Sequence, residues 1–333
     1  MIFVVGNSRS GTTMLGRILG RSADVHTVDE IHFFERLVTA AEISSRPSWS
    51  HGRLLESGEK LLTAAREGVF TEVQPGKYRE EVESAIKDDE LGDPIALYRS
   101  LMTREARMAG KRVPCEHTPR YIFVADLLLE AYPDCRIIHV HRDPRDVLLS
   151  QKNRWRRSGM SAGGFPLIWT LRSWANYHPW LTARLWVSVI HKADTLRQHG
   201  RFFEVGYESI VREPEQALSE ICKFLGISHD PEMMDVEWRG SSQARDDEQL
   251  RGMNVARVGA WRRGGLASAE KFLCEKVAAP SMISRGYEPA KARPNPIGLA
   301  WSLLTLPPKL FVAVLLNLGR LANPVEFFRR RFG

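Results

Sequence analysis

The sequence predicts an α/β fold: a mostly parallel β-sheet flanked by helices on both faces, followed by an apolar helical segment at the C-terminus. Two observations support this prediction. Three short β-rich runs are each followed by residues with helical periodicity, and a glycine-containing loop joins the first run to its helix. Strands that alternate with helices form parallel sheets, because each crossover helix packs back onto the sheet.

The first element is the run IFVV at residues 2–5, which ends at Gly6 and has the composition of a buried strand. Apolar residues then recur at helical spacing within 12–21. The loop between them, GNSRSGTT, has nearly the spacing of the P-loop motif G-x-x-x-x-G-K-[ST], running from Gly6 to Thr13. Strand, glycine turn and helix in this order are the context in which the motif indicates a phosphate site. We therefore expect a P-loop-type sheet.

The loop residues predict how a phosphate is held. The backbone amides of a P-loop and the positive end of the following helix point at phosphate oxygens. Gly11 permits that backbone, Thr12 and Thr13 add hydroxyl donors beside Ser10, and Arg9 offers a planar guanidinium to one anionic group. Thr12 stands where an NTPase loop carries the lysine that reaches the β- and γ-phosphates. The ligand is therefore expected to lack a polyphosphate chain.

The second element is CRIIHVH at 135–141, a buried strand, after which RDPRDVLLSQ opens a helix with a proline near its first turn. Arg142 ends this strand, and Ser150 lies eight residues later, about two helical turns. A strand-end arginine with a helix hydroxyl suits a second phosphate, distinct from the first. Taken alone, a solvated cap made by RDPRD explains these residues equally well.

The remaining elements complete the alternation. A third strand is expected at 201–205, followed by a helix over 214–225 that ends at Gly226. Helical patterns also occupy 33–45, 53–67, 93–109 and 120–131, and a long helix through 167–189 is expected to bend at Pro179. Neither a repeat nor a linker interrupts the chain before about residue 290. Residues 1–290 are therefore expected to form one domain.

Residues 291–333 differ in composition. IGLAWSLLTLPP and LFVAVLLNLG are strongly apolar, and RRR at 329–331 closes the chain. Each apolar half is shorter than the roughly 20 residues that span a bilayer, and Pro307 and Pro308 are expected to interrupt a continuous helix. We expect an interfacial hairpin or an amphipathic docking segment over 295–333. Packing on the domain or in a dimer seam is the alternative.

Composition limits the function classes. Of the 333 residues 43% are hydrophobic and 26% charged, which argues against disorder. A net charge of +7 suits an anionic ligand, an anionic polymer or a membrane surface. The four cysteines form no CxxC pair, so neither a metal site nor a disulfide framework is predicted. The chain enters its first strand without a charged leader or cleavage site, so a cytoplasmic location is expected.

Three motifs together carry a family resemblance. SRSGTTML, RIIHVHRDPRDVLLSQ and VGYESIVREPEQALSEICKFLGI resemble the sulfotransferases that use 3′-phosphoadenosine 5′-phosphosulfate (PAPS), over roughly residues 2–288. In that family the loop holds the 5′-phosphosulfate, and the residues matching Arg142 and Ser150 hold the 3′-phosphate. NVARVGAWRR resembles the late loop that closes over the nucleotide, which implies Arg257 and Gly259 near the 3′-phosphate. The similarity of GYESI places Tyr207 near the adenine. PAPS is then the co-substrate, and no metal is needed.

A further segment resembles one branch of the family. VDEIHFFER resembles the E-x-H-F-F-[DE] segment of the Golgi heparan sulfate sulfotransferases, in which the glutamate is the catalytic base. The matching residue is Glu30, with His32 and Glu35 supporting the acceptor side. Without this motif, a glutamate and a histidine beside two phenylalanines are more typical of a helix start.

The segment EHTPRYIF departs from the family pattern. It matches E-K-[ST]-P-x-[YH] except that His117 replaces the lysine thought to stabilise the bridging oxygen of the leaving nucleotide. A histidine does so only when protonated or as a neutral N–H donor. Alternatively, Arg9 carries more of this task. The implied catalytic residues are thus Glu30, His32, Arg9 and His117.

Three functions are consistent with the sequence. The leading one is sulfuryl transfer from PAPS to a hydroxylated acceptor, which the apolar tail suggests is a glycan or lipid-linked alcohol. A P-loop kinase is disfavoured by the missing lysine, and a non-catalytic nucleotide-binding scaffold by Glu30. No nucleic-acid partner is expected, and a homodimer is left open. Any membrane contact through 295–333 is expected to be peripheral, on the cytoplasmic face.

Overall fold

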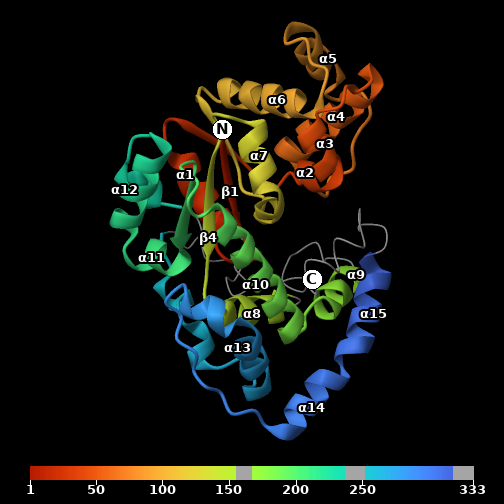
Figure 1. Cartoon of the computed structure of the whole chain (residues 1–333). Helices are drawn as coiled ribbons and strands as arrows, with labels where there is room; N and C mark the ends of the chain where they lie inside the picture. The colour runs from red at the N-terminus through yellow and green to blue at the C-terminus, as the bar shows by residue number, and fades with distance from the viewer. Residues whose placement is uncertain (155–166, 237–251, 318–333) are drawn as a thin grey trace. The chain divides into compact units, whose positions relative to one another are not determined.

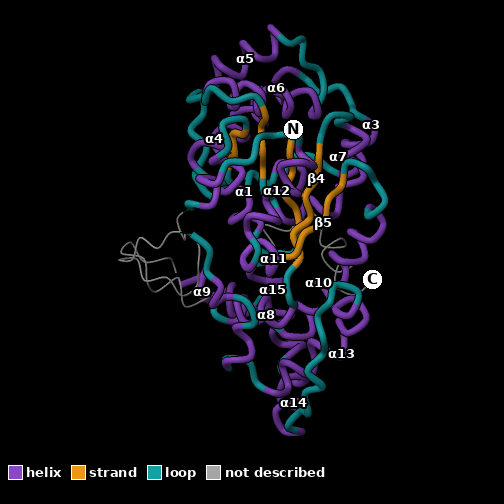
Figure 2. Tube along the Cα trace, turned by 90° about the vertical axis from the view of Figure 1, so that its left-hand side faces the viewer, coloured by secondary structure: helices purple, strands orange, loops and turns teal. Residues whose placement is uncertain are grey.

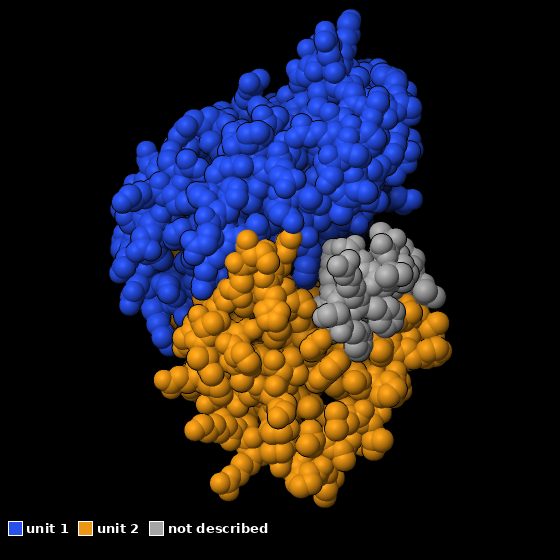
Figure 3. Space-filling model, in the orientation of Figure 1, with its two compact units in different colours: residues 1–140, 196–236 blue, residues 141–195, 237–333 orange. Residues whose placement is uncertain are grey.

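The structure, a computed structural model, describes residues 1–154, 167–236 and 252–317. The chain divides into two compact units, one made of residues 1–140 and 196–236 and the other of 141–195 and 237–333. Figure 3 colours the two units separately. The domain boundary expected near residue 290 stays a prediction.

The first unit holds a five-stranded sheet in the order β2-β3-β1-β4-β5. β1 pairs in parallel with β3 and β4, and β2 pairs in parallel with β3. Helices lie on both sides of the strands, α1 on one and α6 and α7 on the other (Figures 1 and 2). The strands are β1 (Ile2–Gly6), β2 (Val25–Val28), β3 (Val113–Glu116), β4 (Arg136–His141) and β5 (Phe202–Gly206). The predicted P-loop-type α/β fold is confirmed.

Three strands occur where the sequence predicts them, but β2 and β3 were not predicted. Both are only four residues long. β3 also contains Pro114, which cannot donate to a ladder and is uncommon inside a sheet. Pro114 is nevertheless aligned with His26 of β2, while the next residue, Cys115, is aligned with Ile2 of β1. The pairing partners on both sides, rather than local propensity, determine this strand.

The strand order creates a switch point at the centre of the sheet. From β1 the chain crosses to β2 on one side, and from β4 it proceeds to β5 on the other. Ligands of open α/β sheets bind outside the carboxyl ends of the strands at such a point. At those ends Gly6 of β1 and Val140 of β4 are register partners.

One face of β1 is covered by an aromatic cluster. The ring of Phe3 lies 6.0–6.3 Å, between centroids, from the rings of Phe34, Tyr98, Tyr121 and Tyr132. All five side chains are almost completely buried. Rings at these separations gain from their edge-to-face and offset arrangement as well as from burial. This cluster anchors the helices on that face to the central strand.

The helices of the first unit mostly follow the predicted pattern. They are α1 (Thr12–Arg21), α2 (Phe33–Arg36), α3 (Ala40–Ser45), α4 (His51–Glu67), α5 (Arg79–Asp88), α6 (Pro94–Met108), η1 (Pro119–Val124), α7 (Ala125–Ala131), α11 (Tyr207–Arg212), α12 (Pro214–Leu225) and η3 (Pro231–Met234). The single helix expected over 33–45 is wrong, because the chain forms α2 and α3 there, and α5 was missed. Gly226 ends α12 with φ of 67°, the left-handed conformation that glycine permits, as predicted.

The second unit is helical in its described part. Its elements are α8 (Pro144–Lys152), α9 (Leu167–Ala175), α10 (Pro179–Leu196), η4 (Val255–Arg257), η5 (Ala260–Arg263), α13 (Ser268–Ile283), α14 (Pro296–Leu304) and α15 (Leu306–Asn317). The long helix expected through 167–189 is two helices, because the chain breaks before Pro179 instead of bending there. α13 was not predicted.

The C-terminal segment corrects one expectation. Only Thr305 separates α14 from α15, and the amide of Lys309 donates to the carbonyl of Thr305 across the two prolines. Pro307 and Pro308 fall in the first turn of α15, where a missing N–H breaks no helix bond. Residues Pro296–Leu316 therefore form a helical stretch of 21 residues, with mean hydropathy 1.8, which is long and apolar enough to cross a bilayer. A hairpin is wrong for these residues; 329–331 lie outside the described part.

Candidate active site

The loop between β1 and α1 has the backbone of a tight anion cradle. Arg9 and Gly11 both adopt positive φ, 77° and 101°, and the amide of Ser10 donates to the carbonyl of Asn7 at 3.1 Å. α1 begins at Thr12 with no side-chain cap. Its first amides are therefore available to an anion at the positive end of the helix. A non-glycine residue at positive φ costs about 1–3 kcal/mol and is concentrated at functional sites.

Two loop glycines are required by close contacts. A Cβ atom on Gly6 would lie 2.4 Å from the carbonyl oxygen of Val140 in β4. A Cβ atom on Gly11 would lie 2.6 Å from Cδ2 of Tyr207, at the start of α11. The structure thus brings Tyr207, which the resemblance assigns to the adenine, against the phosphate loop.

The loop also holds an unsatisfied buried hydroxyl. Ser10 is fully buried, and its Oγ makes no hydrogen bond within the described part of the chain. Thr12 is buried as well, whereas Thr13 is half-buried. A buried hydroxyl without a partner costs about 1–3 kcal/mol, which a phosphate or sulfate oxygen at this position would recover. The loop residues therefore fit an anionic ligand.

Glu30, His32 and Glu35 form a connected group in the described structure. Nε2 of His32 lies 3.2 Å from Oε2 of Glu30, and Nδ1 of His32 lies 2.5 Å from Oε2 of Glu35. Burial alone would lower the pKa of His32, but the two carboxylates outweigh it and raise this pKa to about 9. His32 is therefore a cation at neutral pH, held between two anions. The side chain of Glu30 is 37% exposed, so a substrate can reach it.

A buried carboxylate, Glu116, positions this segment and was not singled out from the sequence. Its Oε1 accepts from the amide of Ile31 at 2.9 Å, and it also accepts from the hydroxyls of Tyr98 and Thr118. Burial raises the pKa of Glu116 despite these donors. The amide of His32, whose φ is 58°, donates to Thr118 at 3.4 Å. The sequence signal that could have identified Glu116 is its place at the start of EHTPRYIF, three positions before the proline.

His117 lies between the phosphate-loop helix and the acidic segment. A Cβ atom on Gly16 of α1 would lie 2.4 Å from its ring carbon Cδ2, so the ring packs directly on α1. Its Nε2 is 3.4 Å from Oδ1 of Asp29. The side chain is buried, and neither ring nitrogen makes a hydrogen bond in the parts of the chain that are described. His117 thus connects α1 to the residue preceding Glu30.

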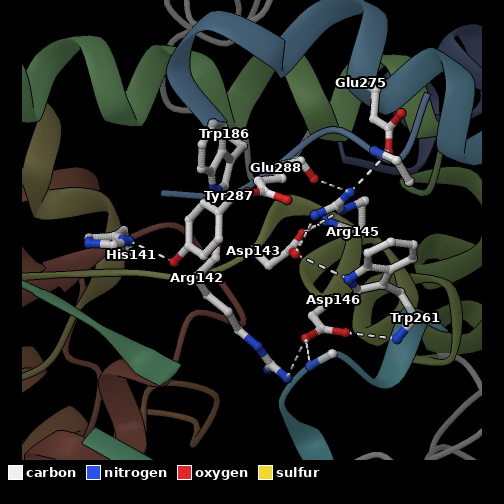
Figure 4. Close-up of polar contacts among 12 residues, drawn as sticks. His141, Arg142, Asp143, Arg145, Asp146, Trp186, Trp261, Glu275, Tyr287 and Glu288 are labelled. Atoms are coloured by element: carbon white, nitrogen blue, oxygen red, sulfur yellow. Dashed lines mark hydrogen bonds and ion pairs between the residues drawn. The ribbon is translucent and has the colours of Figure 1, made fainter. Parts of the chain in front are cut away.

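The second unit carries the other predicted phosphate anchor (Figure 4). Nη2 of Arg142 donates to the carbonyl of Arg257 at 2.7 Å, so two residues that were each expected near the 3′-phosphate are in contact. Oδ2 of Asp146 accepts from the amide of Gly259 at 2.8 Å, and its Oδ1 accepts from the amide of Trp261 at 2.9 Å. Burial raises the pKa of Asp146. Asp146, not predicted from the sequence, therefore fixes the 254–263 loop to α8.

Behind this loop lies a buried ionic cluster centred on Arg145. The guanidinium pairs with Asp143 at 2.8 Å and with Glu275 at 3.0 Å, and it lies 3.9 Å above the ring of Trp261. Arg145 also donates to the carbonyl of Glu288. Charge pairing and a cation–π contact together hold Trp261 in place.

The position of Ser150 follows from α8. Asp143 caps this helix by accepting from the amide of Arg145 at 2.9 Å, and Pro144 occupies its first turn. Arg142 precedes the helix, and Ser150 is half-buried near its end. The pairing of Ser150 with Arg142 on one phosphate stays a prediction.

The charge of His32 predicts a pH-dependent stability. Its pKa is about 6.5 in the unfolded chain and about 9 in the folded one. The stabilisation is therefore fully present below pH 6.5 and disappears as the pH rises through 9, a change on the order of 3 kcal/mol. Urea unfolding at pH 7 and pH 10 should show this loss in the wild type and little of it in His32→Gln. Equal losses of unfolding free energy in both proteins would contradict a folded-state pKa of about 9 for His32.

Known proteins match this chain in sequence and in fold. A protein-family model described as "Sulfotransferase family" matches residues 2–231. Human sulfotransferase 2A1 is 24% identical over 145 residues, which cover 42% of this chain and 46% of that protein. The solved sulfotransferase domain of the Synechococcus PCC 7002 olefin synthase has a TM-score of 0.54 and 21% identity, covering 86% of this chain and 94% of that one. The sulfotransferase domain of the curacin biosynthetic pathway gives 0.50 and 17%, covering 86% and 98%.

The alignments with curated proteins are partial. They reach 46% of the human protein and 30% of an uncharacterized Aquifex aeolicus protein, so the chain spans less than half the length of these relatives. The structural similarities, below 25% identity, concern the fold.

Proposed function

Because the chain belongs to the sulfotransferase family, we propose that it transfers a sulfuryl group from PAPS to a hydroxyl group of an acceptor. One observation carries the proposal beyond the family: His117 packs on α1, the helix that follows the phosphate loop, and contacts Asp29 beside Glu30. A phosphate cradle and an accessible carboxylate therefore belong to one locality of the first unit. This is the arrangement needed to deprotonate a hydroxyl next to an activated sulfate.

Two anchors would hold the nucleotide. The loop amides, Ser10 and Arg9 would bind the 5′-phosphosulfate, and the unsatisfied buried Ser10 hydroxyl supports this fit. Arg142 and Ser150, with Arg257 and the loop around it, would bind the 3′-phosphate. Arg142 follows Val140, the register partner of Gly6, by only two residues. PAPS would supply the activated sulfuryl group.

Glu30 would act as the general base. Its exposed carboxylate accepts the proton of the acceptor hydroxyl, while the cationic His32 holds the carboxylate in place. Glu35 keeps the other imidazole nitrogen engaged, so the ring cannot rotate away from Glu30. A positioned base of this kind contributes about 10²–10⁴-fold to the rate.

Arg9 and His117 would counter negative charge on the sulfuryl and leaving groups. The two ring nitrogens of His117 make no hydrogen bond among the described residues, so one of them is available to a ligand oxygen. Loop amides and a positioned cation stabilise such charge best in a site that excludes water.

The other candidates are less well supported. A P-loop kinase is not favoured, because the family match is to sulfotransferases and the loop carries Thr12 in place of lysine. A glycan or a lipid-linked alcohol remains our proposed acceptor class, and a cytoplasmic location stays a prediction. Transfer of labelled sulfate from PAPS to a panel of alcohols, followed by mass spectrometry, tests both the reaction and the acceptor. No transfer to any acceptor class, with PAPS bound, would favour the scaffold function.

The two-anchor arrangement predicts nucleotide selectivity. Adenosine 3′,5′-bisphosphate should bind much more tightly than AMP, because only the former has a 3′-phosphate for Arg142, and EDTA should not change either affinity. In calorimetry, Arg142→Ala should lose about 1.5–3 kcal/mol of binding free energy toward the bisphosphate. It should lose almost none toward AMP, which is the internal control. Equal affinities of the wild type for the two nucleotides would exclude the second anchor.

A further inference from the structure

The helical stretch 296–316 exposes a regular row of apolar side chains. Ile297, Trp301, Leu304, Phe311 and Leu315 are 80%, 69%, 71%, 65% and 50% exposed, and Pro308 is exposed as well. Successive members of this row are four, three, four, three and four residues apart, the spacing of one helix face. We call these six residues the apolar stripe. An ordered row of this kind is not the scatter of single apolar residues found on soluble surfaces.

The opposite edge of the same stretch is hydrogen-bonded to other residues of the second unit. Nε2 of His178 meets the carbonyl of Ser302 at 2.9 Å, Nζ of Lys309 donates to the carbonyl of Tyr177 at 3.3 Å, and Nε of Arg172 donates to the carbonyl of Leu316 at 2.7 Å. Figure 1 shows α15 running beside α9. The stripe therefore faces away from the body of its own unit.

α9 also carries exposed apolar side chains. Its Leu171 and Trp174 are 46% and 50% exposed, and the ring of Trp174 lies 4.9 Å from Nζ of Lys309. A tryptophan with one exposed edge and a neighbouring lysine is typical of a side chain at a membrane–water interface.

The charge of the segment identifies its partner. Residues 291–333 contain seven lysines and arginines and one acidic residue, Glu326, so six of the seven net positive charges of the chain lie here. Lys291, Arg293 and Lys309 belong to the described part. A basic and apolar segment is complementary to anionic lipid headgroups above an acyl layer. Two copies of such a segment repel each other through their like net charge, which disfavours a second copy as the partner.

We propose that the apolar stripe docks the protein on an anionic membrane surface, with the helical stretch lying in the plane of the interface. The stretch is long enough to span a bilayer, but its polar contacts recur from Ser302 to Leu316, over about 20 Å of helix. Spanning would pull these groups, together with Arg172 of α9 and the residues Tyr177 and His178 that precede α10, into hydrocarbon. The docked orientation leaves them at the headgroup level.

Vesicle binding by the full chain tests this proposal without requiring nucleotide or acceptor. The protein should co-sediment with mixed phosphatidylglycerol/phosphatidylcholine vesicles, bind weakly to pure phosphatidylcholine, and be released by high salt or alkaline carbonate. Trp301→Glu combined with Phe311→Glu should weaken binding by about tenfold or more. Met108→Glu is the matched control, because Met108 is 70% exposed on α6 of the first unit and should bind like the wild type.

Three outcomes would overturn the proposal. The first is equal binding by the stripe variant and the wild type. The second is retention on the vesicles after alkaline extraction, which identifies a spanning helix. The third is a lipid-free dimer, seen by analytical ultracentrifugation, that the stripe variant makes monomeric. Circular dichroism tests whether the stripe variant, Trp301→Glu with Phe311→Glu, keeps its fold. The single variant Trp301→Leu keeps the side chain apolar, so it should bind vesicles like the wild type if lipid contact is the cause.

Discussion

Replacing Glu30 by glutamine should lower kcat by about 10²–10⁴-fold, because the amide keeps the shape of the side chain but cannot accept the proton of the acceptor hydroxyl. The affinity for adenosine 3′,5′-bisphosphate should not change, since the carboxylate of Glu30 pairs with His32 and is not among the residues proposed to bind the nucleotide. Single-turnover sulfate transfer and calorimetry measure the two quantities separately.

The matched control is Glu35→Gln, on the other side of the same imidazole. Nδ1 of His32 contacts Glu35 and its Nε2 contacts Glu30, so both variants remove one carboxylate from the cationic ring. Only Glu30 is expected to take the proton, and Glu35→Gln should therefore lose far less activity. If Glu30→Gln retained more than about a tenth of wild-type turnover, His32 would become the better candidate for the base.

Replacing Arg145 by leucine should lower the free energy of unfolding by about 3–5 kcal/mol, because two buried carboxylates then lose their counter-charge. The guanidinium is only 1% exposed, and both Asp143 and Glu275 are buried beside it. The change also removes the cation–π contact between Arg145 and Trp261, so the 254–263 loop should bind the 3′-phosphate less tightly. Chemical denaturation and bisphosphate calorimetry report these effects.

An exposed ion pair supplies the comparison for this variant. Arg79 pairs with Glu83 on the surface of α5, where its side chain is 54% exposed, and Arg79→Leu should cost about 1 kcal/mol or less. Adding Glu275→Gln to Arg145→Leu should recover part of the lost stability, since it removes one uncompensated charge. A loss in Arg145→Leu no larger than that in Arg79→Leu would show that the cluster does not stabilise the fold.

The predictable part of the fold is the part with strong local signals. The β1 strand, its glycine loop and α1 are contiguous in the sequence, and Gly226 ends α12 as its position predicts. The missed strands β2 and β3 are short, and the proline in β3 opposes strand formation. Their pairing partners are distant in the chain, so no local pattern could reveal them.

In the candidate site, too, some residues are predictable from local motifs and others are not. The loop residues, Glu30 and Arg142 were selected from motifs whose residue types suit phosphate or proton transfer. Glu116 and Asp146 were not selected, because their importance lies in burial and in amide partners far along the chain. The meeting of Arg142 with Arg257, 115 residues apart, is likewise a consequence of folding.

The class of ligand is predicted by residue types alone, because a glycine loop without lysine, a strand-end arginine and a basic apolar tail can be recognised without knowledge of the fold. The charge of His32, in contrast, is a consequence of folding, because its pKa depends on two carboxylates brought to its two ring nitrogens. The near-continuity of α14 and α15 and the covering of one edge of them are likewise seen only in the folded chain. Local propensity acts over a few residues, whereas charge state and exposure depend on every group that folding brings near.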